Sequence, residues 1–130
     1  MRSPWHSDWF GGINFVAFNP NGKTLASGSC DKTIKLWHLE SGQEICTLTE
    51  HSDRVCSVAF NPNGKIIASG SKDKTIKLWQ LDTGNELCTF SVSENVVFSV
   101  AFNPDGKMLT SGSGDKTITL FPIAKAVILL

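Results

Sequence analysis

Residues 70–79 read Gly-Ser-Lys-Asp-Lys-Thr-Ile-Lys-Leu-Trp, and residues 28–37 repeat this stretch with cysteine in place of the first lysine. An altered copy occupies residues 112–121 and ends in phenylalanine instead of tryptophan. The aspartate of the stretch recurs every 42 residues, as Asp31, Asp73 and Asp115. A period of this length without drift indicates one structural unit copied three times.

A second motif repeats in the same phase. Val16-Ala17-Phe18-Asn19-Pro20 returns at residues 58–62 and again at residues 100–104. The two motifs are separated by the same number of residues in all three copies. Chance does not produce such a pattern, so the three segments are copies of one unit. The whole unit between them is therefore expected to fold in the same way each time.

The middle copy shows the secondary structure of the unit. Asn61-Pro62-Asn63-Gly64 has the proline and glycine that a type I turn favours, and Asp82-Thr83-Gly84 supplies a glycine for a hairpin loop. The β-rich runs between these turns predict four short antiparallel strands, at residues 55–60, 65–71, 75–81 and 85–91. A lone sheet of this kind cannot cover both of its apolar faces. A period in the low forties therefore predicts sheets stacked as the blades of a β-propeller.

These residues resemble a WD40 repeat. The resemblance rests on Asp73–Trp79, on the preceding Ala68–Ser71 and on His51 upstream, and it extends from His6 to Phe121. The Asn-Pro-Asn-Gly-Lys turns and nearly identical copies are similar to bacterial WD40 arrays. The resemblance implies an all-β fold of three four-stranded antiparallel blades in one repeat region over residues 1–130. The blades are expected at residues 6–48 (with an insertion), 49–91 and 92–130 (degenerate and truncated).

The resemblance also implies a buried hydrogen-bonded set in each blade. In the middle blade its members are His51, Ser69 (or Ser71, on the same strand face), Asp73 and Trp79. A carboxylate at a tight turn can accept from an imidazole, and a buried indole N–H needs an acceptor. The matching residues elsewhere are Asp31 and Trp37 in the first blade and Asp115 in the third.

The outer copies depart from this pattern. Phe10-Gly11-Gly12 reads as an insertion that detaches His6 from its place in the first copy. In the third copy Ser93 stands where histidine is expected, and Phe121 replaces tryptophan. No hairpin loop follows Phe121, so a complete fourth strand is not expected there.

Three blades are too few to close a ring alone, because propellers usually have about four to eight. The expected structure is an open arc or partial ring whose terminal blades expose an apolar face each. Three outcomes are compatible with this expectation: pairing with copies of itself (two chains would make six blades), completion by other WD40 blades on another polypeptide, or a fragment of a longer gene.

Candidate partner-binding residues lie at one end of the blades, where the turn between the second and third strands meets the connection between blades. They vary between copies while the turn and core residues around them do not. Such variation is typical of a binding surface on a rigid scaffold, and neutral drift of surface residues would produce it as well. They are Arg54, Cys56 and Lys72 in the middle blade, Val96, Phe98 and Gly114 in the third, and Asn14 and Cys30 in the first.

Composition excludes several other functions. The 12 basic and 12 acidic side chains leave no net charge, which disfavours binding to nucleic acid or to an anionic membrane surface.

Residues 1–10 contain no apolar stretch of signal-peptide length, so the cytosol is the expected location. The four cysteines lack metal-ligand spacing and are interpreted as small hydrophobic residues. No metal or cofactor is expected.

Catalysis is not expected either. His51 already has a structural role, and aspartates that recur at three equivalent turns indicate architecture, whereas an active site is normally single. The prediction is a non-catalytic scaffold that binds a protein or peptide. The alternative is a truncated propeller fragment whose only partner is another propeller segment.

Overall fold

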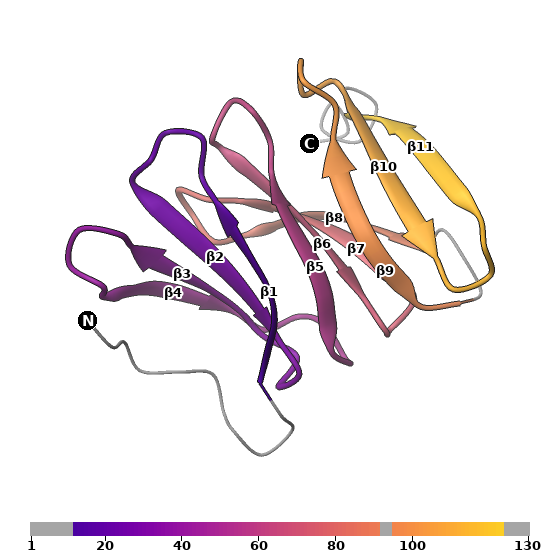
Figure 1. Ribbon diagram of the computed structural model, residues 1–130, viewed down its shortest axis with the longest axis horizontal. Coiled ribbons are helices and arrows are strands. Elements are labelled where there is room, and N and C mark those ends of the chain that lie inside the picture. The colour runs from indigo at the N-terminus through magenta and orange to yellow at the C-terminus, as the bar shows by residue number, and fades with distance from the viewer. Residues whose placement is uncertain (1–11, 92–94, 124–130) are drawn as a thin grey trace.

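The computed structural model describes residues 12–91 and 95–123, and these contain eleven β-strands (Figure 1). The first repeat contributes β1 (Ile13–Phe18), β2 (Thr24–Ser29), β3 (Ile34–His38) and β4 (Glu44–Leu48). The second contributes β5 (Val55–Phe60), β6 (Ile66–Ser71), β7 (Thr75–Gln80) and β8 (Glu86–Ser91). The third contributes β9 (Val97–Phe102), β10 (Met108–Ser113) and β11 (Ile118–Pro122).

Each repeat forms its own antiparallel sheet in which strands follow one another in chain order. The register is the same in all three sheets: Ala17 faces Ala26, Ala59 faces Ala68, and Ala101 faces Thr110. The predicted all-β fold of stacked antiparallel blades is confirmed, with four strands in each of the first two. The third blade has three strands within the described residues, and a fourth strand would fall on residues 124–130, which lie outside them.

The predicted turn residues form the turns between the strands. Gly64 donates its N–H to the Asn61 carbonyl over 2.8 Å and has φ +73°, a conformation that glycine adopts without strain. The turns between the second and third strands instead place a lysine in the left-handed region, with φ values of 69° to 76°. They are held by the preceding aspartate: the Asp73 carboxylate accepts from the Thr75 N–H at 2.9 Å. The lysines are Lys32, Lys74 and Lys116.

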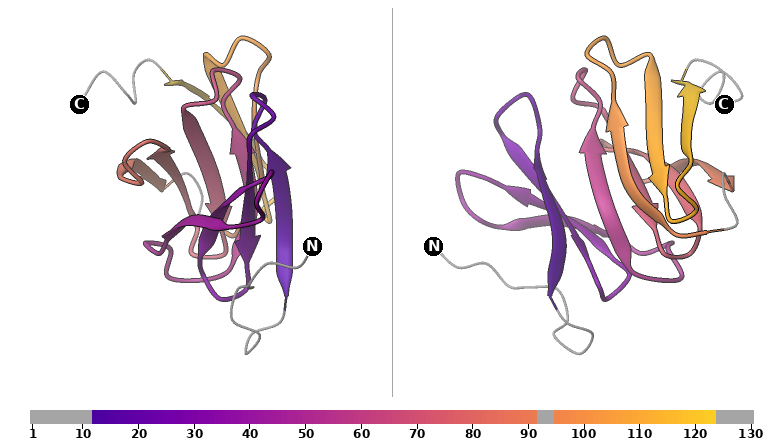
Figure 2. Two further views of the ribbon diagram at one scale, coloured as in Figure 1. Left: turned by 90° about the vertical axis from the view of Figure 1, so that its left-hand side faces the viewer. Right: turned by 45° about the vertical axis from the view of Figure 1, so that its right-hand side comes forward.

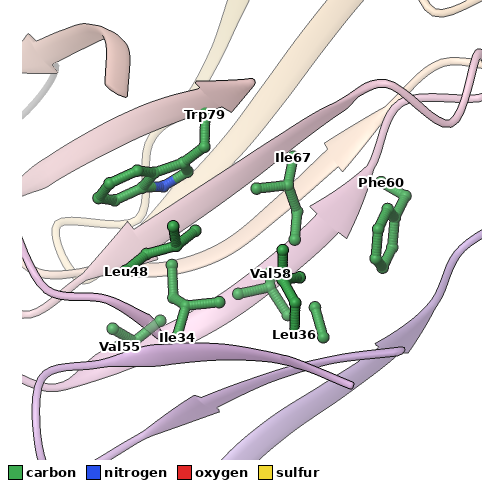
Figure 3. Packing of buried hydrophobic residues seen from close by; sticks show 9 residues of the cluster. Ile34, Leu36, Leu48, Val55, Val58, Phe60, Ile67 and Trp79 are labelled. Carbon is green, nitrogen blue, oxygen red and sulfur yellow. The ribbon is translucent and has the colours of Figure 1, made fainter. Parts of the chain in front are cut away.

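The three sheets stack side by side, so that the first strands of neighbouring blades, β1, β5 and β9, lie next to one another (Figures 1 and 2). An apolar cluster fills the joint between the first two blades, and Figure 3 shows its interlocking side chains. Ile34, Leu36 and Leu48 of the first blade pack against residues of the second blade that include Val55, Val58, Phe60, Ile67 and Trp79. Burying one such side chain is worth roughly 1.5–3 kcal/mol, so the joints supply much of the stability.

The second joint repeats the first. Ile76 and Leu78 of the middle blade pack against Val97, Val100 and Leu109 of the third. At both joints a valine lies directly over a glycine of the preceding blade. A Cβ atom built on Gly28 would come within 2.8 Å of Val55 Cγ1, and one on Gly70 would come within 2.7 Å of Val97 Cγ1. Glycine is therefore what allows adjacent sheets to approach this closely.

We expect Gly28→Ala and Gly70→Ala each to lower the free energy of unfolding by about 1–3 kcal/mol, because the added methyl group forces the joint apart. Gly12→Ala is the matched control, since a Cβ atom there would meet nothing within 4 Å. Urea unfolding followed by tryptophan fluorescence measures the difference. Equal stability of Gly70→Ala and Gly12→Ala would contradict this account of the joints.

Candidate functional site

The middle blade contains a buried hydrogen-bonded set that links four of its segments. The His51 ring lies with Nδ1 2.7 Å from Asp73 Oδ2 and Nε2 2.6 Å from Ser69 Oγ. Trp79 Nε1 donates to the same Ser69 oxygen over 2.9 Å. Because a carboxylate only accepts, Nδ1 carries the proton, and Ser69 can then donate to Nε2 while it accepts from the indole.

The environment of Asp73 favours its charged form. Burial by itself would raise the pKa of this carboxyl group, but hydrogen bonds from His51 and Thr75 outweigh burial. The backbone N–H of Ser52 also donates to Asp73 Oδ2, over 3.1 Å. The net result is a pKa well below the ordinary value. The ionised carboxylate thus joins the turn after β6 to the segment before β5.

Ser71, the other serine considered for this set, has a different role. Its hydroxyl donates to the Arg54 carbonyl over 2.7 Å and accepts from the Asp73 N–H at 3.0 Å. Ser69 therefore joins the imidazole to the indole, while Ser71 ties the turn after β6 to the backbone of Arg54.

The first and third blades hold parts of the same arrangement. Trp37 Nε1 donates to Ser27 Oγ over 2.9 Å, and the Asp31 and Asp115 carboxylates each accept from the N–H of the threonine two residues later, at 3.0 Å. In the third blade Phe121, in the tryptophan position, stacks on Phe90 of the middle blade with ring centroids 5.0 Å apart. His6 and Ser93 lie outside the described residues.

The candidate partner-binding residues lie along one end of the three blades, on and beside the adjacent strands β1, β5 and β9. A repeated backbone hydrogen bond holds them in place: Lys72 N–H donates to the Arg54 carbonyl over 3.0 Å, and Gly114 N–H to the Val96 carbonyl over 2.9 Å. We call these residues the partner strip. Its members are Asn14, Cys30, Arg54, Cys56, Lys72, Val96, Phe98 and Gly114.

The partner strip combines apolar and cationic groups. Phe98 is 54% exposed and Arg54 is also exposed, while Lys72 is half-buried. Burial raises the pKa of the Cys56 thiol, and the nearby charge of Lys72 only partly offsets this effect, so Cys56 presents a neutral thiol. The side chain of Asn14 spans two blades, because its Nδ2 donates to the Val55 carbonyl over 3.1 Å.

Sequence reasoning missed a second set of contacts across the joints. Asn19 Nδ2 donates to the Gly64 carbonyl over 3.2 Å, and Asn61 Nδ2 donates to the Gly106 carbonyl over 2.9 Å. These asparagines were interpreted only as turn residues. The sequence did carry a signal for these contacts, because asparagine recurs at this position every 42 residues. Several other residue types could have formed the turn, so the repeated choice of asparagine pointed to a further role.

Within residues 12–91 and 95–123, no group of three or more His, Cys, Asp or Glu side chains is arranged to hold a metal ion. The same part of the chain holds no helix long and apolar enough to cross a membrane. All four cysteines are free thiols.

Comparison with known proteins places this geometry in context. The family model "WD domain, G-beta repeat" matches the chain three times, at residues 4–38, 42–80 and 84–121. Similar curated proteins include the probable serine/threonine-protein kinase PkwA of Thermomonospora curvata, 52% identical over 40 residues. The Periodic tryptophan protein 2 homolog of Dictyostelium discoideum is 41% identical over 46 residues, and the Nuclear distribution protein PAC1 of Ajellomyces capsulatus is 48% identical over 46 residues.

These matches cover 31% of this chain for the first relative and 35% for the other two. They span only 5%, 5% and 10% of the three relatives, in the same order. The likeness therefore concerns the repeat and not the whole of any of these proteins.

We expect Ser69→Ala to destabilise the protein by about 1–3 kcal/mol, because it leaves His51 Nε2 and Trp79 Nε1 without their shared partner. Ser111→Ala is the matched control, since Ser111 is buried at the equivalent position of a blade with Phe121 in place of tryptophan. Thermal unfolding compares the two variants. A Ser111→Ala variant as unstable as Ser69→Ala would contradict this role of the hydroxyl.

Asp73 is expected to make stability fall in acid. Its pKa is lowered in the folded state from the ordinary value of 3.8, so the unfolded chain binds a proton more readily. The stabilisation is therefore complete above that value and is lost as the pH falls below it. Asp73→Asn should be less stable than the wild type by about 1–3 kcal/mol at neutral pH, and the difference should shrink towards about pH 2.

Asp115→Asn is the control for this titration, because the third repeat contains no histidine. Urea unfolding of the three proteins at a series of pH values measures the difference. A gap between wild type and Asp73→Asn that stays constant with pH would contradict the assignment.

Proposed function

Because this chain belongs to the WD40 repeat family, we propose that it is a non-catalytic protein-interaction module that binds a protein or peptide through the partner strip. The stacked blades provide the rigid support, and the strip provides the contacts. The strip lies at the end of the blades opposite the Asn-Pro turns, on strands that are held in register by the joints.

The observation that carries this proposal is variation within a constant frame. Asn14, Cys56 and Phe98 occupy equivalent positions in the three blades and share no chemical character, and the same is true of Cys30, Lys72 and Gly114. The hydrogen bonds and apolar contacts on either side of them recur in each blade. Surface residues on a rigid scaffold that differ in this way favour recognition of a partner.

The chemistry of the strip suggests the kind of partner. Arg54 and Lys72 provide two positive charges on one blade, and the exposed ring of Phe98 provides an apolar contact on the next. Arginine and aromatic side chains are common anchors of protein interfaces. A segment that carries an acidic side chain beside an apolar one would complement both groups.

The ionisable groups of the described residues support a structural rather than a catalytic role. The side chains of His51 and Asp73 are only 1% and 7% exposed within the hydrogen-bonded set. Lys77 pairs with Glu86 and Lys35 pairs with Glu44 at equivalent places on neighbouring blades. Repetition of a charged pair in successive blades is typical of architecture. As part of the proposal we place the protein in the cytosol, where free thiols such as those of this chain are stable.

Arg54→Ala combined with Lys72→Ala should abolish retention of the partner while the fold stays intact. Neither side chain belongs to the apolar clusters between the blades, so their removal should not destabilise the blades. The control is Lys65→Ala combined with Lys107→Ala, which removes two exposed lysines at the opposite end of the blades. Quantitative mass spectrometry of proteins retained by the tagged wild type and by both variants measures the effect. Equal retention by all three proteins would refute the assignment of the strip.

A further inference from the structure

The two ends of the arc expose side chains that are buried wherever a neighbouring blade is present. On the first blade Ile13, Val16 and Phe18 are 44%, 52% and 69% exposed. Their equivalents in the middle blade, Val55, Val58 and Phe60, are 0%, 1% and 8% exposed. We call Ile13, Val16 and Phe18 the N-terminal face.

The third blade has the opposite face uncovered. Ile118 and Leu120 are 78% and 66% exposed, although Ile76 and Leu78 of the middle blade are both fully buried at the same positions. Ile34 and Leu36 of the first blade are likewise buried. We call Ile118 and Leu120, with the adjoining Gly112 and Asn103, the C-terminal face.

The two internal joints show what each face is built to contact. In both joints a β-branched residue covers a glycine of the preceding blade, as Val55 covers Gly28 and Val97 covers Gly70. An asparagine of the preceding blade also donates to the carbonyl of a turn glycine in the next, as Asn61 does to Gly106. At each internal joint, the residues of the preceding blade that correspond to the C-terminal face therefore contact the residues of the next blade that correspond to the N-terminal face.

Both halves of a third joint of this kind are present and unused within the described residues. Gly112 is the equivalent of Gly28 and Gly70, and a Cβ atom there would meet only Ser99, at 4.0 Å. Ile13 is the β-branched residue that corresponds to Val55 and Val97. Asn103 corresponds to Asn61, although its Oδ1 accepts from the Met108 N–H over 2.9 Å, whereas the Asn61 Oδ1 accepts from the Asn63 N–H. Gly22 corresponds to Gly64 and Gly106 but has nothing within 4 Å of a Cβ position.

We propose that the N-terminal face of one chain binds the C-terminal face of a second copy of the same chain, head to tail. Ile13 of one copy then covers Gly112 of the other, Asn103 donates to the Gly22 carbonyl, and Phe18 and Leu120 become buried in the joint. Two copies related by a two-fold axis form two such joints and a ring of six blades, within the range of about four to eight blades in which propellers close.

A second copy is the occupant that the contacts favour because the two faces match each other and not themselves. Two N-terminal faces brought together would lack both the glycine that Ile13 is expected to cover and the asparagine that is expected to donate to the Gly22 carbonyl. Two differences weaken the new joint. Thr110 stands where the internal joints have Ala26 and Ala68, so a hydroxyl group enters an apolar contact. In addition, the described part of the third blade has no strand that corresponds to β4, whose Leu48 packs in the first joint. Association is therefore expected to depend on protein concentration.

This association uses faces that do not overlap the partner strip, so it can be tested separately from the proposed function. Analytical ultracentrifugation and native mass spectrometry of the 130-residue chain should show a species of twice the 14.1 kDa mass of one chain. That species should dissociate on dilution. A chain that stays monomeric up to the highest soluble concentration would overturn the proposal and would leave both faces to blades of another polypeptide.

Variants of single faces test the head-to-tail geometry. Phe18→Asp and Leu120→Asp should each weaken self-association by roughly 100-fold or more, because each would bury an unpaired carboxylate in the joint. Neither side chain is needed inside one chain, and circular dichroism should show an unchanged fold. Phe98→Asp is the control, since it adds the same charge at an exposed apolar residue of the partner strip and should leave the dimer intact.

Mixing the two variants gives the decisive result. The Phe18→Asp chain keeps an intact C-terminal face, and the Leu120→Asp chain keeps an intact N-terminal face. The mixture should therefore regain one joint and form heterodimers that neither variant forms alone as homodimers. A wild-type dimer that survives both substitutions, or a mixture that remains monomeric, would overturn the proposed geometry.

Discussion

The structure depends on one constraint: each small sheet is apolar on both faces and must have a neighbouring sheet on each side. Close approach at Gly28 and Gly70 meets this constraint, because Val55 and Val97 can then lie directly on the backbone of the preceding blade. The apolar clusters follow from that approach. The same constraint explains the exposed Phe18 and Leu120, whose counterparts within the arc are covered.

The buried hydrogen-bonded set works inside a blade rather than between blades. His51, Ser69, Asp73 and Trp79 tie together the segment before β5, the strands β6 and β7, and the turn between those strands. The ionised Asp73 is stable there because its neighbours donate to it from three directions. Such a set holds the turn in place, and with it the residues of the partner strip that flank the turn.

The molecule thus separates its tasks by location. The faces of the sheets provide cohesion, the interior of each blade provides rigidity, and one end of the blades carries side chains such as Arg54 and Phe98 that neither task uses. Variation at Arg54 and Lys72 is compatible with the fold, because this end is held by the backbone bond between them and by the Ser71 hydroxyl, which bonds to the Arg54 carbonyl. The proposed recognition of a partner and the proposed association of blades can therefore be tested independently.

The amino-acid sequence by itself determined the repeat, the strands and the turn chemistry. In the turns, Asp73 binds the backbone only two residues away, and Gly64 and Gly84 adopt the positive φ that their own turns require. It also indicated the members of the hydrogen-bonded set, although it left Ser69 and Ser71 as alternatives. Only the tertiary structure separated those two serines, since their partners are distant in the chain. It alone showed Asn19 and Asn61 bridging blades, and it alone showed which apolar residues lack cover. These properties depend on how whole sheets are placed against one another, and a local pattern carries no record of that placement.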